Sequence, residues 1–169
     1  ILMINKGGLA WQGSLLAGSL AGFYFIRRRK LPLRLFLDLC APYIALGQSI
    51  GRIGCFLNGC CYGKPWAQGI FVPGLNAHLH PTQLYETVGL FVVFLILKYA
   101  QGRQWAVGHV FALYLCLGGL ERLIVEFFRA DHEWTWLGLS LFQYVALGVM
   151  CCGIILFKVF RHDQNVQRG

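Results

Sequence analysis

Charged residues are scarce in this sequence of 169 residues: they make up 13% of it, and only seven are acidic. Soluble domains carry roughly 25% charged residues, whereas 57% of this chain is hydrophobic and its mean hydropathy is +0.57. Dinucleotide-type G-x-G-x-x-G and P-loop motifs are also missing, so we expect no nucleotide cofactor. These absences favour a protein whose solvent is the lipid bilayer.

Basic residues give the chain a net charge of +8, and they gather at the ends of apolar runs. Membrane proteins that follow the positive-inside rule have this distribution, so we expect no nucleic-acid partner. If the cluster at residues 27–30 is cytoplasmic, an alternating chain places Lys98 and Arg103 in the cytoplasm too. The first residues read as a loop without an initial Met, from which we expect an N-terminal part to precede them.

Five apolar runs predict an all-α, polytopic transmembrane helix bundle that forms a single domain over residues 1–169. The predicted spans cover approximately residues 9–26, 35–50, 83–99, 107–128 and 137–160. The longest connection, residues 51–86, joins the second span to the third. The alternation of the spans places this connection on the outer, non-cytoplasmic side.

Two arginines stand near the outer ends of these runs. Arg52 opens the stretch "GRIGCFLNGCCYGKPW", and Arg122 lies one helical turn before Glu126. Arginine in a bilayer is costly and usually faces a partner or a wet cavity. One reading is a structural Arg122–Glu126 pair; the other is a glycine-lined site where both guanidinium groups bind a phospholipid phosphate. A transporter would carry polar groups through the midplane, whereas these lie on one side only.

Several motifs in order resemble the prolipoprotein diacylglyceryl transferase family. They are "GGLAWQGSLLAG", "GRIGCFLNGCCYGKP", "HPTQLYE", "ERLIVEFFRAD" and "LSLFQ". The resemblance implies a multi-pass enzyme of the bacterial inner membrane with its functional face on the outer, periplasmic side. Such an enzyme moves the diacylglyceryl group of phosphatidylglycerol to the lipobox cysteine of a prolipoprotein signal peptide. The family's usual seven spans imply that the first two precede this chain.

Site residues follow from this resemblance position by position. Arg52, Arg122 and His80 are the expected catalytic residues. The expected substrate-binding residues are Gln12, Asn58, Gly63, Tyr85, Glu86 and Glu126. Four positions depart from the family pattern: Gln12 stands for a histidine, Cys55 for an asparagine, Cys60 for a glutamate and Gly118 for a tyrosine.

These departures fall on the chemistry of the reaction and leave two functions open. Two arginines suffice to stabilise a leaving phosphate, but glutamine cannot accept a proton as histidine can. His80 is the best remaining base, followed by Glu86 and Tyr85. The alternative is a catalytically degenerate relative that serves as a structural or lipid-binding subunit of a larger membrane complex.

Three of the seven cysteines lie in the outer stretch: Cys55, Cys60 and Cys61. On an oxidising side they could form a disulfide or act as reactive thiols. A metal site formed by these cysteines with His78 or His80 matches no strong zinc spacing, so no metal is expected. The other four cysteines lie within apolar runs, where we expect them to be small buried hydrophobes.

Overall fold

A computed structural model describes residues 8–103, 105–130, 135–136 and 138–168. The chain divides into two compact units, Ile1–Phe36 and Leu37–Gly169. The first unit contains helix α1 (Gly8–Arg28), whose last turn carries Arg27 and Arg28. Cations at this end complement the negative end of the helix dipole.

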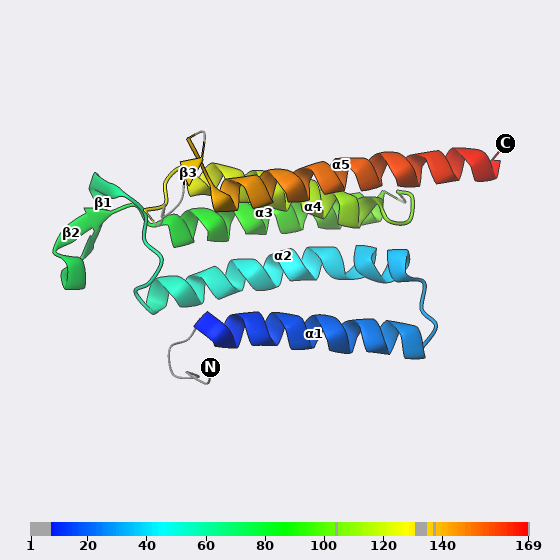
Figure 1. The fold of residues 1–169 in the computed structure, drawn as a ribbon, viewed down its shortest axis with the longest axis horizontal. Helices are drawn as coiled ribbons and strands as arrows, with labels where there is room; N and C mark the ends of the chain where they lie inside the picture. Colours follow the sequence, from blue (N-terminus) through cyan, green and yellow to red (C-terminus); the bar gives the residue numbers. More distant parts are fainter. Residues whose placement is uncertain (1–7, 104, 131–134, 137, 169) are drawn as a thin grey trace. The chain divides into compact units, whose positions relative to one another are not determined.

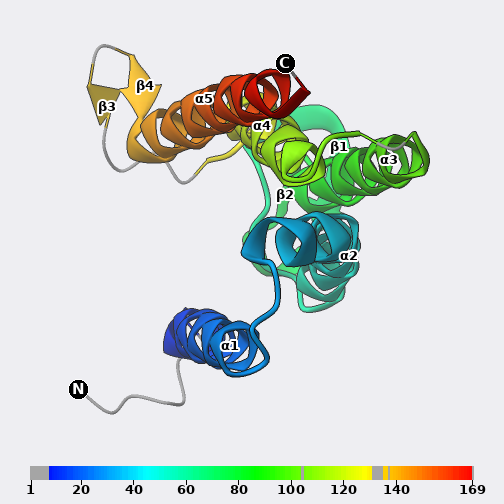
Figure 2. The same ribbon diagram turned by 90° about the vertical axis from the view of Figure 1, so that its right-hand side faces the viewer.

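Four helices make up most of the second unit. They are α2 (Leu33–Leu57), which begins in the first unit, α3 (Thr82–Gly102), α4 (His109–Glu126) and α5 (Leu141–Arg168). Figure 1 shows α3, α4 and α5 running side by side, and the turned view of Figure 2 shows α4 between α3 and α5. The buried apolar cluster of the unit comprises Ala41, Ala45, Val93, Leu97, Ala100 and Val110.

Small residues allow α4 and α5 to approach closely. A Cβ atom at Gly119 would lie 2.9 Å from the carbonyl oxygen of Ala146, and one at Gly153 would lie 2.7 Å from the sulfur of Cys116. Close approach through small residues is the usual way in which helices pack in lipid, where no hydrophobic force drives them together. It fixes α4, and the arginine near its end, against α5.

Two short hairpins interrupt the predicted all-α fold. Strand β1 (Pro65–Val72) pairs antiparallel with β2 (Ala77–Leu79) through a 3-10 turn, η2 (Pro73–Leu75), and β3 (Thr135–Trp136) pairs with β4 (Leu139–Ser140). Both hairpins lie at the same end of the second unit, where α2 ends and α3 begins (Figure 1). The hairpins lie in the connections between the apolar runs, so the hydrophobic periodicity of the sequence does not predict them.

The long connection between α2 and α3 is shorter in the structure than predicted. We expected residues 51–86 to form it, but α2 continues to Leu57 and α3 already begins at Thr82, so the connection comprises residues 58–81. Glycines and an arginine lower the hydropathy of residues 51–57 without preventing a helix that is anchored by tertiary contacts. Arg52 and Cys55 therefore lie on a helix, and Glu86 lies in the second turn of the next one.

Among the residues that the structure describes, two helical segments are long and apolar enough to cross a membrane: Thr82–Gly102 and Leu141–Arg161. Large apolar side chains on both face outward, among them Val88 and Leu95 on α3 and Ile155 on α5. Exposed apolar side chains in this number suit lipid rather than water. The crossing of the bilayer by the other three predicted spans stays a prediction.

Candidate active site

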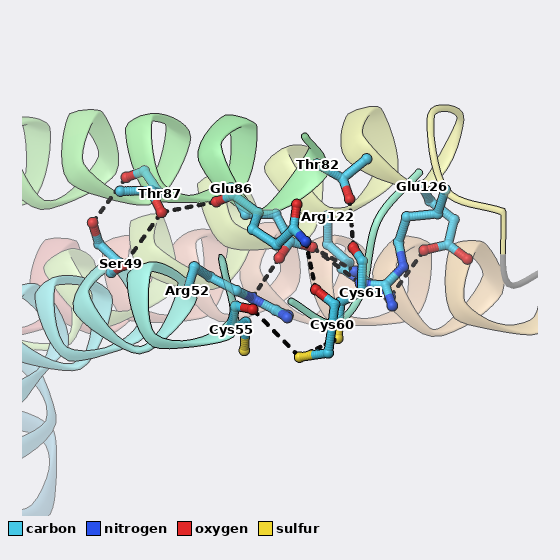
Figure 3. A network of polar contacts seen from close by, with 12 residues as sticks. Ser49, Arg52, Cys55, Cys60, Cys61, Thr82, Glu86, Thr87, Arg122 and Glu126 are labelled. Atoms are coloured by element: carbon cyan, nitrogen blue, oxygen red, sulfur yellow. Dashed lines mark hydrogen bonds and ion pairs between the residues drawn. The ribbon is translucent and has the colours of Figure 1, made fainter. Parts of the chain in front are cut away.

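Three arginines surround the carboxylate of Glu86 at the end of the second unit that carries the hairpins (Figure 3). Arg52 forms an ion pair with it through Nε, Arg122 Nη1 lies 2.7 Å from Oε1, and Arg129 Nη1 lies 3.6 Å from the same oxygen. Glu86 was expected to bind substrate. In the structure it links arginines from three segments of the chain, and its contact with substrate stays a prediction.

Helix direction brings these residues together. The C-terminal part of α2, the start of α3 and the end of α4 meet at one end of the unit, so Arg52, Glu86 and Arg122 come from three different helices. A hydrogen bond of 2.8 Å from Ser49 Oγ to the carbonyl oxygen of Thr87 joins α2 to α3 beside the ion pairs. This bond fixes the register of the two helices at the site.

Glu126 forms the second carboxylate of the site. Its Oε2 lies 2.9 Å from Arg122 Nη2, as the i, i+4 spacing predicts, and its Oε1 accepts a 2.9 Å hydrogen bond from Ser140 Oγ. Ser140 and Gln143 form a reciprocal capping box at the start of α5, with bonds of 2.8 and 3.2 Å. The sequence reading missed Ser140, Gln143 and Arg129 as site residues, although "LSLFQ" contains the S-x-x-Q signal of such a cap.

The carboxylates are more deeply buried than the arginines that they hold. The side chains of Glu86 and Glu126 are 2% and 1% exposed, whereas those of Arg52 and Arg122 are 30% and 24% exposed. Buried carboxylates behind partly exposed guanidinium groups hold the latter in fixed orientations. The ring of Phe142 lies 5.4 Å from the Arg122 guanidinium and restricts it further.

His80 lies in an aromatic cluster. Its ring stacks on that of Trp66 at 4.5 Å, its Nδ1 shares a 3.2 Å hydrogen bond with the hydroxyl of Tyr85, and the ring of Phe128 lies 5.4 Å away. Within the described part of the chain, no ion pair or hydrogen bond joins His80 to Arg52 or Arg122. The structure therefore brings Tyr85 to His80 and keeps both separate from the ion-pair network.

Gly63 has a packing role. Its amide donates to the carbonyl oxygen of His80 at 2.8 Å, and it forms an isolated β-bridge with Arg129. A Cβ at this position would collide with the carbonyl oxygen of Phe128, with Thr82 and with His80. Only glycine therefore lets the connection after α2 lie directly against the end of α4.

Within the described part of the chain, Asn58 makes no ion pair or side-chain hydrogen bond with this network. Asn58 is exposed just after the end of α2, where its amide donates to the carbonyl oxygen of Gly54 at 2.9 Å. Gln12 lies on α1 in the first unit, and its side chain, like Asp131 at the end of the "ERLIVEFFRAD" motif, lies outside the described residues. Gly118 lies on α4, where a Cβ would contact only the ring of Tyr114 at 3.8 Å.

Cys55, Cys60 and Cys61 are free thiols that lie together. The sulfurs of Cys60 and Cys61 are 3.5 Å apart, and all three sulfurs lie within 4.8 Å of one another. Burial, with a smaller contribution from the hydrogen bond to Cys60, raises the pKa of Cys61 from 9.0 to about 11. Cys61 is therefore a protonated thiol near neutral pH, which argues against an activated nucleophile at this position.

Two membrane-capable helices with exposed apolar side chains and an arginine–carboxylate cluster at one end of the second unit are the features of a helical membrane protein with a polar site. A family model described as prolipoprotein diacylglyceryl transferase matches residues 1–159. The chain belongs to this family of bacterial membrane enzymes, as its motifs predicted.

Curated relatives support the same assignment. The chain is 35% identical over 169 residues to a Clostridium tetani protein, with 95% of this chain and 68% of the relative covered. It is 36% identical over 161 residues to a Finegoldia magna protein, covering 92% and 63%. It is 42% identical over 136 residues to a Geobacter sulfurreducens protein, covering 76% and 51%. Each of these relatives is named phosphatidylglycerol–prolipoprotein diacylglyceryl transferase, and the chain spans about half to two thirds of their lengths.

Proposed function

We propose that the protein containing this chain transfers a diacylglyceryl group from phosphatidylglycerol to the cysteine thiol of a prolipoprotein. The observation that carries the proposal is the arrangement of Arg52 and Arg122, whose partly exposed guanidinium groups are held from behind by the buried Glu86 and Glu126. The substrates named for the relatives are a phosphate-containing lipid and a lipoprotein precursor. A pair of fixed guanidinium groups suits the first of these.

The transfer requires an anion to be stabilised. The acceptor sulfur attacks the carbon of the diacylglyceryl group that is bonded to a phosphate oxygen. A carbon–sulfur bond forms and the carbon–oxygen bond breaks. The electron pair of the broken bond stays on the phosphate oxygen, which leaves as part of glycerol phosphate. Negative charge therefore increases at the phosphate in the transition state. Donors that are already oriented there typically contribute a factor of about 10²–10³ in rate each. In this proposal Arg52 and Arg122 are these donors.

The acceptor thiol must also lose its proton. His80 is the proposed base, because an imidazole changes its charge near neutral pH. Its stacking on Trp66 and its hydrogen bond with Tyr85 support this role, because they fix both the position and the orientation of the ring. The separation of His80 from the ion-pair network favours the alternative in which the chain binds the lipid as a subunit of a larger membrane complex.

Placement in the membrane is part of the proposal. We infer that five helices cross the bilayer and that the arginine cluster lies at its outer, periplasmic side. The basic residues at the end of α1, together with Lys98 and Arg103 at the end of the second unit away from the site, support this orientation. The exposed Asn58 lies on the inferred outer side, where it can contact the headgroup or the signal peptide. Gln12 is proposed to contact substrate from α1.

The experiment is diacylglyceryl transfer from labelled phosphatidylglycerol to a lipobox peptide by the purified full-length protein. We expect transfer by the wild type and a fall of at least about 10²-fold in both Arg52→Ala and Arg122→Ala. Arg103→Ala is the matched control, because this exposed arginine contacts Tyr99 away from the site and should leave the rate unchanged.

Lipid that co-purifies with each variant separates the two functions. Wild-type protein that retains phosphatidylglycerol but transfers nothing, while the two site variants lose the lipid, would replace the enzyme by the lipid-binding subunit. Wild-type protein that neither transfers nor retains the lipid would contradict both.

A further inference from the structure

Three thiols converge beside the arginine cluster, and the proposed transfer uses none of them. Cys55 lies in the last turn of α2, and Cys60 and Cys61 lie in the turn that follows. All three sulfurs lie within 4.8 Å of one another, and those of Cys60 and Cys61 are 3.5 Å apart. Figure 3 shows the three side chains beside Arg52.

The backbone around these thiols is held in an unusual conformation. Cys61 has φ +68°, in the left-handed region that non-glycine residues rarely adopt. Two buried side chains of α3 hold the carbonyl groups of the turn: Thr82 Oγ1 donates to the oxygen of Cys61 at 2.8 Å, and Gln83 donates its Nε2 to that of Cys60. These contacts fix the turn that brings Cys60 and Cys61 to Cys55.

The spacing of the sulfurs matches that around a metal ion. A Zn–S distance of about 2.3 Å in tetrahedral geometry places sulfurs roughly 3.8 Å apart. The observed separations of 3.5 Å and at most 4.8 Å differ from this by about an ångström or less. A disulfide would require two sulfurs at about 2 Å and would leave the third thiol without a partner.

Chemistry selects the class of ion. The potential ligand atoms of the cluster are all sulfur, whereas Mg²⁺ and Ca²⁺ require oxygen ligands. The histidines weighed with these cysteines have other contacts: His78 Nδ1 lies 3.0 Å from the carbonyl oxygen of Gly69, and His80 stacks on Trp66. We propose that Cys55, Cys60 and Cys61 bind one thiophilic metal ion of the Zn²⁺ class.

The surroundings suit such a complex. Three thiolates with one divalent ion carry one net negative charge, and Arg52, three residues before Cys55 on α2, supplies a positive charge beside the cluster. Gln83 is 1% exposed, and its Oε1 has no hydrogen-bond partner within the described part of the chain, so the lining of this turn retains an unused acceptor. A bound ion would join the end of α2 to the next turn and so fix the segment that carries Arg52.

The test is the metal content and Zn²⁺ binding of the purified, reduced full-length protein. Elemental mass spectrometry and titration with Zn²⁺ after chelator treatment should give one ion per chain. Co²⁺ in its place should produce sulfur-to-cobalt charge-transfer absorption. Cys55→Ser, Cys60→Ser and Cys61→Ser should each lose this stoichiometric binding. The double variant Cys151→Ser/Cys152→Ser is the control, because it removes two adjacent exposed cysteines of α5 and should bind as the wild type does.

A second measurement needs no variant. In the wild type, Zn²⁺ should protect the three outer cysteines from alkylation and leave the labelling of Cys151 and Cys152 unchanged. Absence of Zn²⁺ binding by the reduced protein would overturn the proposal, as would equal binding by the three serine variants. A disulfide between Cys55 and Cys60 in protein isolated without reductant would overturn it as well.

Discussion

Two buried carboxylates at opposite ends of the second unit are satisfied in different ways. At one end, Asp38 of α2 is 7% exposed and accepts hydrogen bonds from the amides of Gly108 and Phe111, at 2.6 and 2.7 Å. At the other end, Glu86 of α3 is 2% exposed and is surrounded by Arg52, Arg122 and Arg129.

The Asp38 end is complete in itself. The first amides of a helix have no partner within it, and a carboxylate near them also matches the positive end of the helix dipole. Asp38 therefore acts as the cap of α4, supplied by a neighbouring helix. Gln101 Nε2 donates to the carbonyl oxygen of Asp38 at 2.7 Å and closes the arrangement. The described partners of Asp38 are two backbone amides and Gln101, and none of them carries a positive charge that could bind a further anion.

The Glu86 end has such capacity. Three guanidinium groups contact two carboxylates, and each guanidinium has five N–H donors. The side chains of Arg52 and Arg122 keep about a quarter of their surface exposed. Burial of a carboxylate alone therefore does not indicate function. A surplus of oriented positive donors around it does.

Glu86→Gln should have the largest effect of any single change that keeps the size of the side chain. The amide leaves Arg52 and Arg122 without their common counter-charge, so we expect transfer to fall by at least about 10²-fold. Stability should fall by about 2–4 kcal/mol, somewhat below the cost of breaking a fully buried ion pair, because Arg52 is 30% exposed. Transfer assays and thermal unfolding in detergent measure the two effects. Full activity in this variant would show that Glu86 does not position the arginines.

Asp38→Asn tests the opposite end. Asparagine is neutral and has one acceptor oxygen where aspartate has two, so one of the two amides loses its bond and the other keeps a bond that is no longer charge-assisted. Stability should fall by about 1.5–3 kcal/mol. Transfer per folded molecule should remain at the wild-type rate, because the residue lies away from the arginines. A loss of transfer larger than the loss of folded protein would mean that the two ends are coupled.

Ser140→Ala should have the smallest effect. It removes one neutral-to-charged hydrogen bond to Glu126 and one side of the capping box at the start of α5. Glu126 keeps its ion pair with Arg122, so stability should fall by about 1 kcal/mol. Transfer should fall by less than about tenfold. Ser140→Thr keeps the hydroxyl group and should restore both quantities. An unchanged unfolding midpoint in Ser140→Ala would exclude the capping role.

Much of the site could be predicted from the sequence. Arg122 and Glu126 stand at i, i+4 on one helix, so their pairing follows from local geometry. The link from Arg52 to Glu86 depends on the register between α2 and α3, which no local pattern encodes. The end of α2 could not be predicted from the apolar residues either. The apolar run stops at position 50, whereas α2 continues to Leu57. Arg52, in these last turns, is held at the site by its ion pair with Glu86.

Other features of the site depend on tertiary contacts, so local sequence patterns do not predict them. The turn at Cys61 has a left-handed conformation without a glycine, and Thr82 and Gln83 on the next helix hold it. The stacking of His80 on Trp66 likewise joins two residues of the connection through the β1–β2 hairpin. The arginines could be expected from their cost in lipid alone, but their partners required the fold.

The most direct test of the account is retention of phosphatidylglycerol by the purified full-length protein, measured by native mass spectrometry. The wild type is compared with two double variants, each of which removes two positive charges. Arg52→Ala/Arg122→Ala removes them from the site, and Lys98→Ala/Arg103→Ala removes them from the opposite end of the unit. We predict that the first variant loses at least about tenfold in lipid retention, since each charge-assisted bond contributes about 1.5–3 kcal/mol, and that the second retains the lipid. Equal retention by both variants, or selective loss in the second, would contradict a phosphate site at Arg52 and Arg122.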